Sequence, residues 1–414
     1  MTLRKIRPAT ALSRAALVGS GLLIGSGLLA GCQHDSGRQP ASVPKSSSAP
    51  HGYVEGAEET AEQQPRLVLA DAGTGAVGVL DLITEDITPL KRTDGVRGLR
   101  ADGRFAYLRT GSATHVVDTG TWMVDHGDHV HYYRAGIRDV GPIGAADTAR
   151  IHSDPAVTAV SSARGAGELF DRKRLESGTV PRGRALPGTD GGAIVPYKEH
   201  LLVASAGAGR DTVEVRDRDG ARVVTLEEPC AEARGEAVTR RGAVFGCADG
   251  ALLVSEDKGT FGAEKIVYGE DVSGSDRAVD FRHRAGSTTL AARSGAEAVW
   301  ILDVTDRAWT RIRTGPVVAA NTAGEGAPLL ALGRDGALSA YDIATGKRTV
   351  RKELLTKEAA SGTASPVIEI DTTRAYINDA AAKKVYEIDY NDRLRLARTF
   401  PLGFAPTYMV ETGR

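Results

Sequence analysis

Apolar and polar residues alternate with a period of two along most of the chain from residue 65 onward. The recurring unit is an apolar strand, a short turn that usually contains Gly, and an alternating strand that mostly ends in apolar-x-Asp; the first copy reads RLVLADAGTGAVGVLDL. This alternation predicts β-strands. Eight copies occur, and their last acidic residues are Asp81, Asp118, Asp171, Asp217, Glu256, Asp303, Asp342 and Asp389.

The spacing of the copies predicts their arrangement. Successive acidic residues lie 37 to 53 residues apart, 44 on average, and a period near 44 with four strands per unit is typical of a propeller blade. Segments such as GAIVP and SPVIEI supply inner strands, and the final FAPTYMVET is expected to pair with the first hairpin and close the ring. The predicted fold class is all-β, one eight-bladed β-propeller over residues 65–414. Seven blades, or a two-sheet sandwich with chance repetition of hairpins, are the alternatives.

The first 31 residues have the pattern of an export signal. Four basic residues precede an apolar stretch of small residues from 15 to 30, and Leu-Ala-Gly-Cys ends at Cys32. This ending resembles the lipobox of bacterial lipoproteins, in which the cysteine is lipidated and becomes the mature N-terminus; a plain secretory signal or an uncleaved anchor is the alternative. Residues 1–31 are therefore predicted to be a lipoprotein signal peptide, and residues 32–64, rich in Ser, Pro, Gln and Gly, a disordered tether. We expect an exported protein on the extracytoplasmic face of the cell membrane, attached only by its lipid.

Charge and motifs exclude several functions. The chain has 52 basic and 53 acidic side chains, and no basic cluster is interleaved with aromatic residues, so nucleic acid is not an expected partner. Gly73, Gly75 and Gly78 fit GxGxxG, but a strand follows them where a dinucleotide site needs a helix. No catalytic motif stands out, and we expect a monomeric protein that is not an enzyme.

Two cysteines remain after Cys32. Cys230 and Cys247 form an even pair in an exported chain, which predicts a disulfide. Two free thiols that bind a soft metal are the alternative.

A histidine cluster is the main candidate for chemistry: three of the nine histidines lie in DHGDHVHYY, residues 125–133. If HVHYY is an outer or connecting strand, His129 and His131 project from one face with Cβ atoms roughly 7 Å apart, and His126 reaches them from the turn. Asp128 or Asp125 can complete the set, so Zn²⁺ is the favoured ion, although Ni²⁺ or Cu²⁺ would also bind. Because neutral imidazole is required, affinity is expected to fall below about pH 6.5. The alternative is a surface strand whose histidines bond to loops.

Five segments carry a resemblance to a known family: HGYVEGAEE, RLVLADAGTGAVGVLDL, DHGDHVHYY, VPYKEHLLVA, and Cys230 followed by RGEA and VFGCADG. They resemble the AztD family of extracytoplasmic zinc metallochaperones, eight-bladed propellers that pass zinc to the solute-binding protein of an ABC zinc importer. The resemblance implies that His126 and His129 are zinc-site residues with Asp128 and His131 adjacent. It also places His152 where the family usually has a histidine, and it matches the cysteine pair.

The sequence departs from the family pattern at three places. Histidines usual in the family are absent near Asp190, Arg234 and Ser361, positions expected to begin inner strands that line the central channel. A guanidinium cannot ligate a metal, so either the metal site has contracted to residues 126–131 or this is a paralogue that has abandoned zinc. The predicted function is a zinc metallochaperone. The alternative is an interaction or envelope scaffold whose channel holds an anion or peptide carboxylate near Arg234.

Overall fold

The computed structural model describes Val54 and residues 56–126, 129–144, 148–163, 165–204, 211–361 and 366–414. These residues belong to one compact unit, Ala49–Arg414. The predicted signal peptide, Cys32 and Asp128 lie outside the described residues. None of the helices within these ranges is long and apolar enough to cross a membrane.

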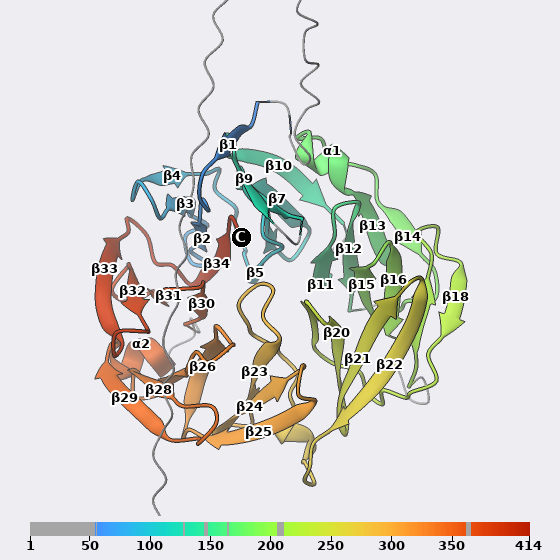
Figure 1. Ribbon diagram of the computed structural model, residues 1–414. Helices are drawn as coiled ribbons and strands as arrows, with labels where there is room; N and C mark the ends of the chain where they lie inside the picture. The colour runs from blue at the N-terminus through green and yellow to red at the C-terminus, as the bar shows by residue number, and fades with distance from the viewer. Residues whose placement is uncertain are drawn as a thin grey trace, which may run out of the picture. The chain divides into compact units, whose positions relative to one another are not determined.

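Eight antiparallel sheets form a ring in which each sheet is one blade (Figure 1). Within a blade the strands run from the centre outward in chain order. The first blade is the exception, because its innermost strand is the last strand of the chain, β34. The first four blades are β34 (Tyr408–Thr412), β2 (Arg66–Ala70), β3 (Val77–Asp81), β4 (Ile87–Pro89); β5 (Gly98–Ala101), β6 (Phe105–Arg109), β7 (Thr114–Asp118), β10 (Arg138–Ile143); β11 (Thr148–Ser153), β12 (Val157–Ser162), β13 (Gly167–Asp171), β14 (Arg184–Leu186); and β15 (Ala193–Tyr197), β16 (His200–Ala204), β17 (Val213–Arg216), β18 (Arg222–Thr225).

The remaining four blades follow the same order. Blade six has three named strands, and its innermost position is held by a bridge between Arg282 and Ala291. The strands of blades five to eight are, in that order, β19 (Glu236–Thr239), β20 (Gly242–Cys247), β21 (Gly250–Asp257), β22 (Thr260–Val267); β23 (Thr289–Ser294), β24 (Ala298–Asp303), β25 (Ala308–Arg313); β26 (Val317–Thr322), β27 (Leu329–Gly333), β28 (Ala337–Tyr341), β29 (Arg348–Glu353); and β30 (Ile368–Ile370), β31 (Ala375–Asp379), β32 (Lys384–Asp389), β33 (Arg395–Pro401).

The ring closes through its two ends, as the sequence predicts. Strand β34 pairs with β2 along its whole length, from Arg66 opposite Thr412 to Ala70 opposite Tyr408. The eight predicted copies are the second and third strands of the eight blades, so the eight-bladed prediction is confirmed and the sandwich alternative is wrong.

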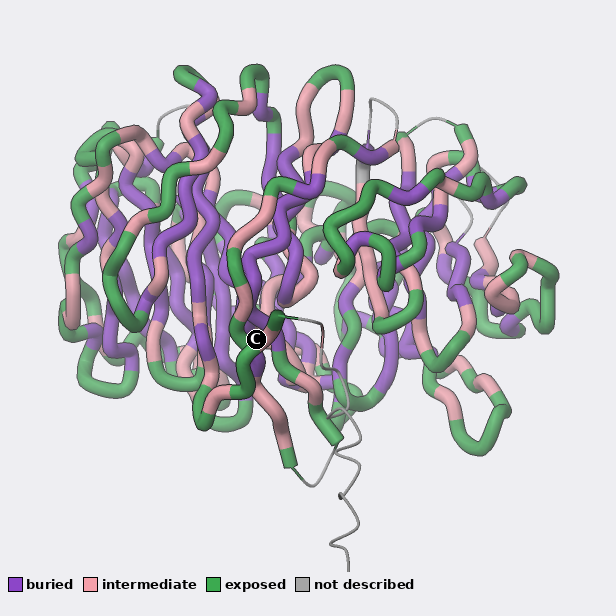
Figure 2. The backbone as a smooth tube through the Cα atoms, turned by 90° about the horizontal axis from the view of Figure 1, so that it is seen from above, coloured by how far each residue is buried: buried purple, intermediate pink, exposed green. Residues whose placement is uncertain are grey.

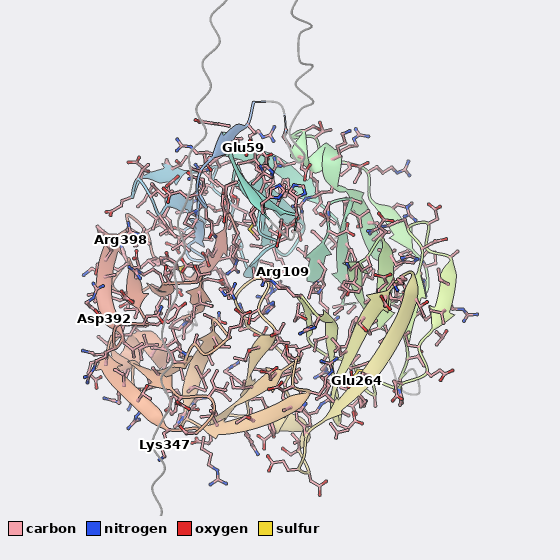
Figure 3. The ribbon with its side chains drawn as sticks, viewed as in Figure 1. Glu59, Arg109, Glu264, Lys347, Asp392 and Arg398 are labelled. Atoms are coloured by element: carbon pink, nitrogen blue, oxygen red, sulfur yellow. A yellow bond between two sulfur atoms is a disulfide. The ribbon has the colours of Figure 1, made fainter. Side chains whose placement is uncertain are left out.

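Burial explains why the middle strands are apolar on both faces. Every residue of β2 is buried, whereas every residue of the outer strand β18 is exposed. Adjacent blades stack face to face, so their middle strands contact a neighbouring blade on each side (Figure 2). The charged side chains of Glu264, Lys347, Asp392 and Arg398 lie on the outer rim (Figure 3).

The recurring acidic residue stabilises the turn that follows the third strand. Asp81 accepts hydrogen bonds from the backbone N–H groups of Ile83 and Thr84, at 3.0 and 3.2 Å. Asp303 does the same for Thr305 and Asp306, at 2.8 and 2.9 Å. An aspartate whose carboxylate binds backbone donors two and three residues ahead favours a tight turn, which explains why the repeat ends in this residue type.

Three features outside the ladders bear on the predictions. Cys230 and Cys247 form a disulfide with an S–S distance of 2.05 Å, which confirms the predicted pairing and excludes the thiol site. The short helices are α1 (Arg172–Glu176), capped by Asp171, and α2 (Lys357–Ser361).

Strand β1 (Glu58–Thr60) falls within residues 32–64, the stretch that the sequence assigned to the tether. Its backbone pairs with β9 (Val130–Arg134). Ordered pairing therefore starts before Pro65.

Candidate metal centre

The histidine cluster lies on a hairpin inserted into blade two. Strands β8 (Thr121–Asp125) and β9 follow β7 in the chain, and the blade is completed only afterwards by β10. Together with β1 they form a separate three-stranded sheet in the order β1-β9-β8. The His126 N–H donates to the His129 carbonyl oxygen at 2.9 Å, so these two residues face each other across the hairpin end. The segment is thus a connecting hairpin, which is one of the two placements the sequence allowed.

The strand register brings the three imidazoles to one face. Val124 pairs with His131, and the pairing continues to His126 opposite His129. Because side chains alternate along a strand, His129 and His131 share a face. The ring centroids are 4.9 Å apart for His126 and His129, 4.9 Å for His129 and His131, and 5.2 Å for His126 and His131.

The three side chains can offer nitrogen atoms to one ion. One ligand atom from each residue lies within 4.8 Å of the other two. Two nitrogens on a tetrahedral zinc ion are about 3.3 Å apart, given Zn–N bonds of about 2.0–2.1 Å. Side-chain rotations that move each nitrogen by about 1 Å would therefore bring the three atoms to this spacing. His126 and His129 are exposed and His131 is half-buried, so the group is open to solvent on one side.

A carboxylate from β1 supports the cluster. Glu59 pairs with Tyr133 across β1 and β9, and its Oε1 lies 2.6 Å from Nδ1 of His131 (Figure 3 shows Glu59 beside the hairpin). With Nδ1 bonded to the carboxylate, Nε2 of His131 is left to face an ion. A carboxylate behind a ligating histidine fixes its tautomer and raises its basicity. The Glu59 charge is also felt by Tyr133, where burial and this carboxylate raise the pKa of the phenol.

Sequence reasoning missed Glu59. The residue lies 72 positions from His131 in the chain, and the pairing of β1 with β9 leaves no local pattern that would place the two together. Glu59 ends the HGYVEGAEE segment that carries the family resemblance, but that segment gives no sign of a contact with the histidines.

The base of the hairpin is packed tightly. Trp122 stacks on Tyr133 with ring centroids 5.4 Å apart, and the Arg104 guanidinium lies 3.8 Å from the Trp122 ring centroid. Arg104 in turn binds Asp118 through two hydrogen bonds of 3.0 and 2.9 Å, and both side chains are buried. A cation over an aromatic face in such a desolvated position is worth about 2 kcal/mol. The packed base holds the exposed tip in place.

A glycine closes the neck of the hairpin. Gly120 has a φ of 71°, and a Cβ at this position would lie 2.3 Å from the Ala135 carbonyl oxygen. The Ala135 N–H donates back to the Gly120 carbonyl at 2.6 Å. Only glycine fits this close approach without strain.

His152 lies elsewhere. It belongs to β11, and its Nε2 is 3.5 Å from Glu236, which also binds Arg150 at 2.9 Å. These residues line a cavity of about 780 Å³ in the channel. His152 does not join His126, His129 and His131 in the histidine cluster that the structure describes. The remaining predicted residue, Asp128, lies outside the described ranges.

The three positions that depart from the family pattern do not form one group. Arg234 is exposed to the channel cavity, two residues before β19. Asp190 is exposed in the loop before β15. The prediction that Ser361 begins an inner strand is wrong: it ends α2, its hydroxyl donates to the Lys357 carbonyl at 2.7 Å, and it lines a second cavity.

Comparison with known proteins identifies the fold. No protein-family model and no curated protein sequence matches the chain. Two solved structures of AztD from Citrobacter koseri are similar, one with a TM-score of 0.70, 16% identity and coverage of 85% of this chain and 98% of that chain. The other, the apo form, has a TM-score of 0.72, 14% identity and coverage of 84% and 98%. The dihydro-heme d1 dehydrogenase NirN in complex with DHE is also similar, with a TM-score of 0.55, 15% identity and coverage of 84% and 75%. The chain therefore has an AztD-type propeller fold.

Proposed function

We propose that this chain is an extracytoplasmic zinc metallochaperone that captures Zn²⁺ at the tip of the inserted hairpin. The observation that carries the proposal is the convergence of His126, His129 and His131, with one ligand atom from each within 4.8 Å of the others. The carboxylate of Glu59 behind His131 supports the same interpretation. The likeness to AztD supports it at the level of the fold.

The geometry suits capture followed by release. Three neutral imidazoles bind zinc well, and a water molecule or a carboxylate would fill the fourth position. A metal site with an open position exchanges ligands more readily than a closed structural site with four protein ligands. Because the tip is exposed, an acceptor protein can approach and replace the imidazoles one at a time.

The proposed setting follows from the sequence. Lipidation at Cys32 would anchor the protein to the cell membrane, and the tether would hold a monomeric propeller on the extracytoplasmic side. The proposed acceptor is the solute-binding protein of a zinc ABC importer. In this role the protein is not an enzyme, since it transfers an ion without a covalent reaction.

Zinc titration of the chain from residue 32 onward, with Cys32→Ser to omit the lipid, tests the proposal. A competing chelator sets the affinity scale. The His126→Ala/His129→Ala variant is expected to bind more than about a hundredfold more weakly, because two ligands are lost and outer-shell partners alone are typically worth 10–100-fold. His200→Ala is the matched control, since His200 lies on β16 beside Phe261. Equal affinity of the double variant and the control would contradict the proposal.

A transfer assay tests the second half of the proposal. The zinc-loaded protein is mixed with the metal-free solute-binding protein, and the transfer rate is compared with that to a chelator of equal affinity. Faster transfer to the protein than to the chelator is expected. Equal rates would mean passive release and would remove the chaperone role while leaving zinc binding intact.

A further inference from the structure

The central channel contains more arginine than its carboxylates can neutralise. Arg100 on β5, Arg234 before β19 and Arg282 on the inner edge of blade six line the cavity of about 780 Å³. An adjoining cavity of about 400 Å³ shares Asp280 and Arg282 with the first and adds Arg293 and Arg334. Arg109, at the end of β6, also lies near the centre of the ring (Figure 3).

Most acidic side chains of the larger cavity already have a partner. Asp102 is held by Arg172, which is not part of the cavity lining. Glu236 is held by Arg150 and His152. Asp280 remains, 3.4 Å from Arg282. Each carboxylate of the lining is therefore already engaged by a cation, and none of them is bonded to Arg100 or Arg234.

Two arginines of the larger cavity have no side-chain partner within the described part of the chain. Among the residues that the structure describes, neither the Arg100 nor the Arg234 guanidinium makes a hydrogen bond or ion pair. A guanidinium presents five donors in a planar fork, and both residues line a cavity that other cationic residues also line. An anion in this cavity would supply the missing acceptors.

Positive charge also contributes to the pKa shifts of neighbouring groups, after the larger effect of burial. Burial and the charge of Arg414, with further contributions from Arg284 and Arg282, lower the pKa of His283 to about 4. Burial and the nearby Arg282 also lower the pKa of Arg100. Asp280 and Glu369 act on Arg100 in the opposite direction but do not outweigh these effects.

We propose that the arginine-lined cavity binds a small oxyanion with two or more negative charges, carried by carboxylate or phosphate groups. Arginine binds both groups through paired, charge-assisted hydrogen bonds. The volume is within the usual range of about 300–1,000 Å³ for small-ligand sites. None of the three histidines of the hairpin lines either cavity, so this site is separate from the proposed zinc site.

Calorimetric titration of the Cys32→Ser chain with citrate and with inorganic phosphate tests the proposal and separates the two sources of charge. Binding of either anion is expected at one site, weaker as the salt concentration rises. Arg100→Ala and Arg234→Ala should each weaken binding about tenfold, because each loses charge-assisted bonds worth at least this factor. Neither substitution leaves an unpaired carboxylate, so both variants should keep the melting temperature of the parent.

Arg348→Ala on the exposed outer strand β29 is the matched control and should bind as the parent does. The His126→Ala/His129→Ala variant should also keep its anion affinity, which distinguishes failure of this proposal from failure of the zinc proposal. No binding of either anion at low salt, or binding that Arg100→Ala and Arg234→Ala leave unchanged, would overturn the proposal.

Discussion

The hairpin tip and the central channel are built from opposite kinds of polar side chain. At the tip, three imidazoles converge, the Glu59 carboxylate bonds to His131, and the site is open to solvent. In the channel, arginines face each other, and the two histidines are engaged: His152 by Glu236, and His283 by the Val238 carbonyl oxygen at 3.3 Å. The first arrangement suits a cation and the second suits an anion.

The difference shows how one scaffold can keep the two proposed binding sites apart. The inner strands of the blades fix where the channel side chains point, but the inserted hairpin has its own sheet and its own packed base. Substitutions in the channel can therefore change its charge without moving the tip. If residues of the channel also bound the metal, the hairpin tip and the channel would not be independent. The following predictions test whether they are.

The neck of the hairpin should be the most sensitive position. Gly120→Ala is expected to lower the free energy of unfolding by about 2–4 kcal/mol and to weaken zinc binding, because the new Cβ meets the Ala135 carbonyl at a positive φ. Gly136→Ala is the control, since a Cβ there has no atom within 4 Å. Thermal unfolding and zinc titration measure both effects. Parent-like zinc affinity in Gly120→Ala would show that the packed base does not position the tip.

Glu59 should matter to zinc and not to the channel. Glu59→Gln is expected to lower zinc affinity about tenfold, because a neutral amide holds His131 less strongly than a carboxylate does. Glu58→Gln is a matched control from the neighbouring residue on the other face of β1. Equal losses in both variants would point to net charge near the tip and against a specific role behind His131.

Glu411 should make the stability of the propeller depend on pH. Burial, with the nearby Asp371 and Glu369, raises the pKa of this β34 carboxyl to about 8 against the favourable charge of Arg414. The folded state thus binds more protons than the unfolded state between about pH 4.5 and 8, and stability falls as the pH rises through this range. Glu411→Gln should remove this fall. The melting temperature of the variant minus that of the parent should therefore be about 2–5 °C larger at pH 8.5 than at pH 5. A difference that is constant with pH would be evidence against a neutral Glu411.

His152 should have the smallest effect on zinc. His152→Ala is expected to change zinc affinity by less than about twofold, because the side chain is bound to Glu236 in the channel. The same titration as above measures it. A loss of tenfold or more would mean that the channel contributes to metal binding and that the two regions are not separate.

The fold could be predicted further than the site. The repeat of paired strands, the closing role of Tyr408–Thr412 and the Cys230–Cys247 disulfide follow from local patterns and residue counts. The shared face of His129 and His131 follows from strand alternation. The Glu59 partner could not be predicted, because it depends on a strand pairing across 72 residues. Nor could the burial of Arg104 beneath Trp122, which depends on how the hairpin base packs.

Crystals of the zinc-loaded protein, measured on both sides of the zinc absorption edge, test the central claim most directly. The anomalous difference map should show one principal peak between His126, His129 and His131 at the hairpin tip, with Glu59 still bound to His131. A principal peak beside His152 or His283 in the channel, or no peak at the tip under conditions in which the protein retains zinc in solution, would contradict the account.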